Sequence, residues 1–273
     1  MEKAVSALLA DAGVPVLRSA RNYRPSIDWP ALEVKLLKPQ NIVEMLQAGT
    51  RDLGFAGADW VSEKAADVVE LLDTGLNPVR VVAAVPVGLL EDGRLPRMPL
   101  RVASEYERLT RAWIDSRELD ATFVRTYGAT EVFPPEDADC IVDNTATGAT
   151  LVANGLQVLD ELMVSSTRLY ASREALEDER KRARIEDLVM LLRSVLEARG
   201  RVIVELNVSA SQLDAVIDRL PSMGGATVSP LTGDRGFAVK AAVPRRQVAL
   251  LIPDLKSCGG SDLIVTEISQ LVL

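Results

Sequence analysis

The segment from Cys140 to Leu151 constrains the fold most, because it joins a short apolar run to a turn and a helix start. The run Cys140-Ile141-Val142 predicts a buried strand that delivers an acidic residue, Asp143, to its C-terminal end. Gly148 lets the backbone approach a ligand closely, and the free N–H groups at a helix start attract anions. The segment therefore predicts a strand-to-helix loop that holds a phosphate group.

The polar side chains of this segment have separate expected tasks. Thr145, Thr147 and Thr150 can add hydroxyl donors to a bound phosphate. Asp143 is negatively charged, so we expect it to take ribose hydroxyls, or a magnesium ion, beside the phosphate. The alternative is a strand-to-helix loop whose threonines only cap the helix.

Composition limits the class of protein. The 273 residues exceed one average domain, and 48% of them are apolar, which is enough for two or three compact units. A net charge of −8 argues against a nucleic-acid or membrane-surface partner. The N-terminus does not resemble a signal peptide, and no apolar run approaches the roughly 20 residues that span a bilayer. We expect a cytoplasmic protein.

The chain contains no histidine, which excludes a Ser-His-Asp triad, a histidine general base and a histidine metal ligand. Cys140 and Cys258 lie in unrelated segments and are typical of small buried hydrophobic residues. Catalysis therefore has to rely on carboxylates, hydroxyls, Lys and Arg, backbone dipoles, and oxygen-bound metals such as Mg²⁺.

The first two thirds of the chain alternate predicted strands and helices. In residues 1–87, we expect a helix over 41–48 and strands over 32–37, 53–55 and 79–85. A stretch rich in Gly and Pro, 88–99, leads to a second unit with strands near 100–103, 122–127 and 140–142. This alternation predicts an α/β fold with mainly parallel sheets. Two such lobes joined by a crossover favour a bilobal, periplasmic-binding-protein-like architecture, with the site in the cleft.

The last hundred residues predict a long helix and a separate module. Apolar spacing indicates one helix over 173–199, which Gly200 ends as a C′ residue. Residues 201–273 follow a ferredoxin-like βαββαβ order. Its predicted elements are strand 202–208, helix 211–220, strands 226–231 and 236–243, helix 246–256 and strand 263–268.

The run from Asp143 to Leu156, DNTATGATLVANGL, resembles the phosphoribosyl-pyrophosphate (PRPP) loop of the ATP phosphoribosyltransferase family. An aspartate, a TGxTL core and a following N-x-L are all present. Further similar stretches occur in the family's order, and the resemblance covers nearly the whole chain. They lie at 37–42, 52–59, 103–106, 128–131 and 227–231.

The resemblance implies transfer of the phosphoribosyl group from PRPP to N1 of ATP, with release of pyrophosphate, as the first step of histidine biosynthesis. It implies Mg²⁺ as the cofactor and Asp143, Asp139 and Lys38 as catalytic residues. PRPP would contact the loop residues Asp143, Thr145, Thr147, Gly148, Ala149, Thr150 and Leu151, and ATP would lie near Arg18, Arg21, Glu105 and Glu131. An ordinary surface lysine is the alternative for Lys38, and a structural role is the alternative for Glu105 and Glu131.

The C-terminal module is similar to the regulatory domain of the long form of this family. The resemblance implies feedback inhibition by histidine, bound near Thr227, Ser229, Leu231, Val265 and Thr266, and a homo-oligomer, either a dimer or a hexamer. A passive oligomerisation domain is the alternative. The expected domains are lobe I, residues 1–87 with 167–199 returning to it, lobe II, residues 88–166, and the C-terminal domain, residues 200–273.

One departure from the family pattern lies at the N-terminus. Family members begin with a strand and a Lys-Gly-Arg-like turn, whereas Met1 is followed almost at once by a predicted helix over 3–12. Either the start lies further upstream, or the chain is a divergent member with weakened activity. Three hypotheses therefore compete: an active PRPP-dependent enzyme, a non-catalytic regulatory homologue, and a solute-binding or sensory module.

Overall fold

The computed structural model describes residues 1–17, 23–30 and 32–273. The described residues form two compact units. Of the described residues, the first unit contains 1–5, 17, 23–26 and 32–185, and the second contains 6–16, 27–30 and 186–273. Arg18 and Arg21, the arginines expected near ATP, lie outside the described residues.

Helices and strands alternate through the first two thirds of the chain. The helices are α1 (Glu2–Asp11), α2 (Pro39–Gln47), α3 (Ala58–Lys64), α4 (Glu107–Ser116), η1 (Thr130–Val132, a 3-10 turn), α5 (Ala149–Ala153), α6 (Arg173–Glu177) and α7 (Glu179–Arg199). The strands are β1 (Val16–Leu17), β2 (Ser26–Ile27), β3 (Leu53–Gly57), β4 (Val69–Pro86), β5 (Leu100–Ser104), β6 (Ala121–Arg125), β7 (Cys140–Thr145) and β8 (Leu156–Ala171).

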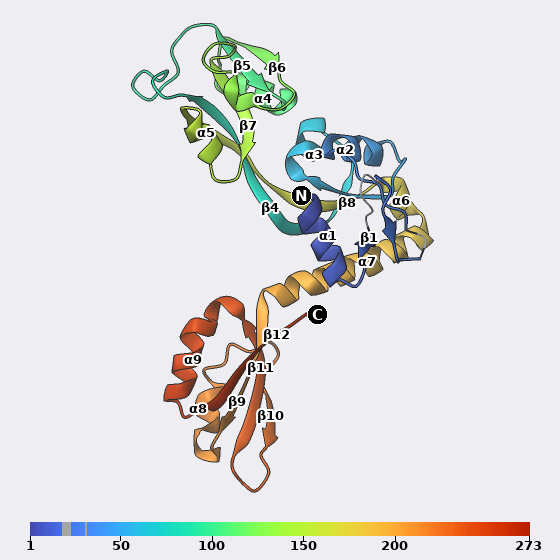
Figure 1. Ribbon diagram of the computed structural model, residues 1–273, viewed down its shortest axis with the longest axis vertical. Coiled ribbons are helices and arrows are strands. Elements are labelled where there is room, and N and C mark those ends of the chain that lie inside the picture. Colours follow the sequence, from blue (N-terminus) through green and yellow to red (C-terminus); the bar gives the residue numbers. More distant parts are fainter. Residues whose placement is uncertain (18–22, 31) are drawn as a thin grey trace. The chain divides into compact units, whose positions relative to one another are not determined.

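The main sheet has the strand order β3-β8-β4-β7-β5-β6. Its centre is the long antiparallel pair β4 and β8 (Figure 1). β3 pairs with the last residues of β8, whereas β7 pairs with the second half of β4. The two long strands therefore connect an end that carries α2 and α3 with an end that carries α4, β5 and β6.

Among the described strands of this sheet, only β5–β6 and β5–β7 are parallel, and the other pairings are antiparallel. The expectation of mainly parallel sheets is therefore wrong. β4 and β8 reverse the chain between the two ends, and two long neighbouring strands that run in opposite directions make an antiparallel ladder. The prediction of an α/β fold with two lobes is confirmed.

Both faces of the sheet are covered around its centre. Val81 to Val85 of β4 are completely buried, and successive side chains of a strand point to opposite faces. Val81, Ala83 and Val85 pack in one apolar cluster with Trp60 and Tyr106. Val82 and Ala84 pack in a second cluster, with Ile141 and Leu151. Residues 140 and 142 of β7 belong to the first cluster and residue 141 to the second, so the two faces of β7 meet different cores.

The C-terminal module is a four-stranded antiparallel sheet with the order β10-β11-β9-β12. Val202, Val204, Leu206 and Val208 alternate along β9 and fill the core beneath the helices. This arrangement confirms the ferredoxin-like βαββαβ module. Its elements are β9 (Arg201–Val208), η2 (Ala210–Gln212), α8 (Leu213–Ile217), β10 (Thr227–Pro230), β11 (Phe237–Pro244), η3 (Arg245–Gln247), α9 (Val248–Ser257) and β12 (Ser261–Glu267).

Three local expectations are wrong. The described residues of 32–37 form no strand, although the N–H of Leu36 donates to the carbonyl of Tyr23 at 2.9 Å. The helix over 173–199 is interrupted at Asp178, whose carboxylate accepts the backbone N–H groups of Arg180 and Lys181 and so caps α7. Gly200 does not adopt the left-handed conformation of a C′ glycine, because β9 begins at the next residue.

None of the described helices combines the length and the apolar composition that a membrane span requires.

Candidate functional site

The loop after β7 is a tight turn that leads into α5. Gly148 has φ +81° and ψ −2°, a left-handed conformation that favours glycine, and nothing lies within 4 Å of the place a Cβ would take. The N–H of Gly148 donates to Oγ1 of Thr145 at 2.9 Å, and the N–H of Ala149 donates to Oγ1 of Thr147 at 3.3 Å. The two threonines thus form the turn and keep their own hydroxyl protons for donation.

Asp143 stands half-buried just before this turn. Its Oδ1 accepts the N–H of Asn144 at 2.7 Å. Burial, with smaller contributions from the carboxylates of Glu131 and Glu105, raises the pKa of Asp143 from 3.8 to about 6, although the Asn144 N–H opposes the change. The structure therefore places Glu105 and Glu131 close enough to Asp143 for their charges to act on it. Three partly buried carboxylates beside an open turn suit a ligand that brings hydroxyl donors or positive charge.

The carboxylates do not form a metal site by themselves. Within the described residues, no group of three or more Asp, Glu or Cys side chains is arranged to hold a metal ion. A magnesium ion at Asp143 would therefore need oxygen ligands from the substrate and from water, which Mg²⁺ commonly keeps.

Asp139 is not part of this cluster. It precedes β7, whereas Asp143 lies near the strand's other end, roughly 13 Å away at about 3.3 Å per residue. Its Oδ2 accepts the backbone N–H of Arg101 at 2.7 Å and pairs with the Arg101 Nε at 3.4 Å. The geometry corrects the expectation for Asp139, because its carboxylate fastens the start of β5 to β7 instead of facing the loop.

Lys38 is exposed and immediately precedes Pro39, the first residue of α2. Its side chain makes no hydrogen bond or ion pair with the described residues, so its expected contact with a phosphate stays a prediction. The remaining loop positions are placed as expected. Ala149 and Thr150 are exposed in the first turn of α5, and Leu151 is buried beneath it.

The residues expected to bind histidine are not gathered in one place. Thr227 and Ser229 lie in β10 and Leu231 follows it, whereas Val265 and Thr266 lie in β12. β10 and β12 are the opposite edges of a four-stranded sheet, roughly 14 Å apart at about 4.8 Å per strand. A single histidine therefore cannot contact both edges of one chain, and the expected contacts with histidine stay a prediction.

The sequence patterns did not reveal four polar side chains that form hydrogen bonds with residues distant in sequence. They are Asp59, Glu63, Tyr106 and Asn144. Asp59 and Tyr106 end two of the family-like stretches, and Asn144 lies inside the loop motif, so the stretches were found but the contacts were not. Their partners are distant in sequence, which no local pattern reveals.

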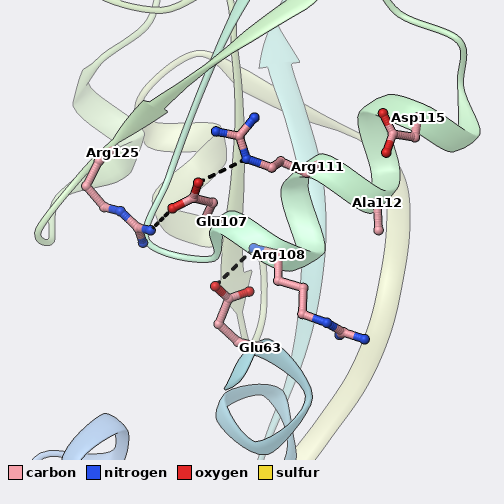
Figure 2. Close-up of a pocket in the computed structure, with 7 residues that line it drawn as sticks. All are labelled: Glu63, Glu107, Arg108, Arg111, Ala112, Asp115 and Arg125. Atoms are coloured by element: carbon pink, nitrogen blue, oxygen red, sulfur yellow. Dashed lines mark hydrogen bonds and ion pairs between the residues drawn. The ribbon is translucent and has the colours of Figure 1, made fainter. Parts of the chain in front are cut away.

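An open pocket of about 530 Å³ lies beside α4, and none of the predicted site residues lines it (Figure 2). Its arginines are engaged within the protein: Arg111 and Arg125 both pair with Glu107, and Nη1 of Arg108 donates to the carbonyl of Ser62 at 2.8 Å. The pocket is lined by Glu63, Glu107, Arg108, Arg111, Ala112, Asp115 and Arg125.

Comparison with known proteins decides which family has this arrangement. The sequence model of the ATP phosphoribosyltransferase (HisG) family matches residues 38–194, and the model of the HisG C-terminal domain matches residues 198–270. The chain belongs to the ATP phosphoribosyltransferase family. The first match contains the loop after β7, and the second contains the ferredoxin-like module.

Curated relatives extend the similarity over nearly the whole chain. An ATP phosphoribosyltransferase of Pelotomaculum thermopropionicum is 35% identical, with 100% of this chain and 96% of the relative covered. Relatives with the same name from Chlorobium luteolum and Prosthecochloris aestuarii are 34% and 35% identical, and each comparison covers 97% of this chain and 92% of the relative.

Among solved structures, a chain of the ATP phosphoribosyl transferase (HisG:HisZ) complex from Thermotoga maritima is similar, with a TM-score of 0.62 and 25% identity. The alignment covers 70% of this chain and 94% of that chain. The family expected from the loop motif and the long-form organisation is therefore confirmed, and a solute-binding or sensory module is set aside.

Proposed function

We propose that the chain transfers the phosphoribosyl group of PRPP to N1 of ATP and releases pyrophosphate, the first step of histidine biosynthesis. The loop from Asp143 to Leu151 carries the proposal. It presents an open glycine turn next to a cluster of carboxylates, in a chain that its transferase relatives match over nearly its full length.

The reaction breaks the bond between C1′ of the ribose and the pyrophosphate oxygen and forms a bond from C1′ to N1 of the adenine. Pyrophosphate is a good leaving group, so the protein contributes chiefly by positioning the two substrates and by electrostatics. Backbone N–H groups and threonine hydroxyls at Thr147 to Thr150 would hold the 5′-phosphate, and Asp143 would accept hydrogen bonds from the ribose hydroxyls. Mg²⁺, held mainly by substrate oxygens, would neutralise the leaving pyrophosphate.

Lys38 would contact a phosphate from the end of the sheet that carries α2, and Glu105 and Glu131 would contact the ribose or the ATP. The enzyme would have three domains: lobe I (residues 1–87 with 167–199), lobe II (residues 88–166) and the C-terminal domain (residues 200–273). A homo-oligomer, either a dimer or a hexamer, in the cytoplasm is the expected form of the enzyme.

A direct assay tests the proposed activity. With ATP, PRPP and Mg²⁺ present, the purified chain should release pyrophosphate and form a product that absorbs as an N1-substituted adenine nucleotide. Omitting either substrate is the control, since hydrolysis of ATP or of PRPP alone would also release phosphate-containing products. PRPP binding by calorimetry without turnover would favour the alternative, a weakened homologue that acts as a ligand-binding or regulatory subunit.

We also propose that residues 200–273 bind histidine and inhibit the enzyme. Because β10 and β12 are opposite edges of the sheet, histidine would use one edge at a time, or a junction with a second copy. A ligand present at 100 times its dissociation constant stabilises the folded state by about 2.7 kcal/mol. Millimolar histidine should therefore raise the melting temperature of the full chain by several degrees, whereas histidinol, which lacks the carboxylate, should not. The absence of any shift with histidine would contradict a regulatory role.

A further inference from the structure

A chain of hydrogen bonds links α3 to the residue that follows Asp143. The Ser165 hydroxyl donates to Oδ1 of Asp59 at 2.7 Å, and the Tyr106 hydroxyl donates to Oδ2 of Asp59 at 2.6 Å. Nδ2 of Asn144 then donates to the Tyr106 oxygen at 2.9 Å. Asp59, Ser165 and Tyr106 are each at most 5% exposed, so these bonds are shielded from water and costly to break. We call Asp59, Tyr106 and Asn144 the anchor chain.

The anchor chain holds β7 where the sheet gives it least support. β5 pairs with β7 only as far as Val142, whereas β4 continues to pair with β7 as far as Thr145. Beyond Val142, the segment that leaves β5 replaces the missing strand. The Ser104 hydroxyl donates to the carbonyl of Val142 and accepts the Tyr106 N–H at 2.8 Å, and the Tyr106 side chain then holds Asn144.

Asn144 and Asp143 point to opposite faces of β7, because successive side chains of a strand alternate. Asn144 lies on the face of Cys140 and Val142, which pack in the cluster that contains Tyr106. Asp143 lies on the other face, where the charges of Glu131 and Glu105 act on it. Fixing Asn144 on one face therefore fixes the backbone N–H that hydrogen-bonds the Asp143 carboxylate on the other.

Asp59 is itself firmly held. A Cβ on Gly57 would lie 2.1 Å from Oδ1 of Asp59, so only glycine fits beside this carboxylate. One turn later on α3, one oxygen of Glu63 accepts the N–H of Arg108 at 3.0 Å (Figure 2). The other oxygen of Glu63 accepts the N–H of Leu109, also at 3.0 Å. Glu63 thus caps α4 from outside and fixes the helix start next to Tyr106.

Tyr106 is suited to donate to Asp59. Burial and the neighbouring Asp59 carboxylate raise the pKa of the Tyr106 hydroxyl well above its usual range, so it keeps its proton. Its ring stacks on Trp60 with the centroids 4.7 Å apart. A phenylalanine would retain that packing and lose only the hydroxyl.

We propose that Tyr106 and Asp59 are positioning residues for phosphoribosyl transfer: they hold Asn144, and through its backbone they orient Asp143 toward the ribose. The role rests on the proposed function. Under this proposal, Asp59 of α3, at one end of the sheet, controls the orientation of Asp143 in the loop region of β7, at the other end.

The test compares Tyr106→Phe with Tyr170→Phe, which removes a hydroxyl from another buried tyrosine of the same apolar cluster that lies outside the anchor chain. Tyr106→Phe should lower kcat/KM for PRPP about tenfold, a loss typical of one buried hydrogen bond. Tyr170→Phe should lower it less than twofold. Equal losses in the two variants would overturn the positioning role.

The pH profile separates positioning from a general loss of stability. The Asn144 N–H lowers the pKa of Asp143, so loosening Asn144 should move the acid limb of PRPP affinity to higher pH. Asn144→Ala, at an exposed position, should move the limb in the same direction and add little when combined with Tyr106→Phe. If the acid limb of PRPP affinity did not shift, or if the shifts of Tyr106→Phe and Asn144→Ala added up in the double variant, the coupling of Tyr106 to Asp143 through Asn144 would be contradicted.

The coupling can also be measured without activity. The pH dependence of the unfolding free energy includes a contribution from Asp143, which the difference from Asp143→Asn isolates. Tyr106→Phe should shift that contribution upward in pH, whereas Tyr170→Phe should not. An inactive wild-type chain would refute the proposed function, whereas an unchanged pH dependence would refute the anchor chain.

Discussion

Asp143→Asn is expected to stabilise the chain by about 2–3 kcal/mol at pH 7.5 and to lower its transferase activity about a hundredfold. Burial together with the Glu131 and Glu105 carboxylates makes the charge at position 143 unfavourable. An asparagine removes the charge and retains an oxygen that can accept the Asn144 N–H. The same change removes the charged acceptor proposed for the ribose hydroxyls, so stability and activity should move in opposite directions.

The expected gain depends on pH in a defined way. The pKa of Asp143 is raised from 3.8 to about 6 in the folded chain, so below pH 3.8 the group is protonated in both states and contributes nothing. Between pH 3.8 and pH 6, Asp143 ionises in the unfolded chain but not in the folded chain, so the free energy of unfolding falls as the pH rises. Above pH 6, Asp143 is ionised in both states, and the full cost of its buried charge lowers the stability of the folded chain. The gain from Asp143→Asn should therefore be about 1 kcal/mol at pH 4.5 and greatest above pH 6.

Urea unfolding at the two pH values measures this effect, and Asp139→Asn is the matched control. Asp139 is at the other end of β7, where its carboxylate accepts from the Arg101 N–H and pairs with its guanidinium. Removing that charge should destabilise the chain. If Asp143→Asn were also destabilising at pH 7.5, the account of a strained carboxylate cluster would be wrong.

Local sequence patterns predicted the elements of the fold but not the pairing of the two longest strands. The sequence analysis expected a strand only over 79–85, whereas Gly75, Asn77 and Pro78 just before it are residues that disfavour a regular strand. In the structure, β4 begins at Val69 and passes through these residues with register shifts against β8, and Gly75 and Asn77 both have positive φ. The ladder with β8 accommodates this irregularity. β8 begins only at Leu156, far along the chain from β4, so a local pattern cannot reveal the pairing.

The candidate site could also be predicted only in part from the sequence. The loop from Asp143 to Leu151 could be predicted because strand, turn and helix start are contiguous. The anchor chain could not, since Asp59 and Tyr106 are separated by 47 residues and Tyr106 and Asn144 by 38. The expectation that Asp139 acts beside Asp143 has a related cause. The two residues are close in sequence, but an extended strand between them places their side chains far apart.

Gly148→Val is expected to reduce PRPP affinity about a hundredfold or more. The left-handed conformation at Gly148 costs a β-branched residue about 1–2 kcal/mol, and the open space beside it is where the phosphate has to approach the backbone. Losing two hydrogen bonds to a charged phosphate accounts for a hundredfold weakening. Calorimetry with PRPP and Mg²⁺ measures the loss directly.

Gly155→Val is the matched control for backbone strain. Gly155 follows α5, has φ +67°, and likewise has nothing within 4 Å of the place a Cβ would take. Both valines should therefore impose similar strain, and only the one at position 148 stands in the turn that would receive the phosphate. The two variants should unfold at similar urea concentrations, with PRPP affinity lost in Gly148→Val and kept in Gly155→Val. Equal affinities would mean that the turn only caps α5, and that the phosphate binds elsewhere.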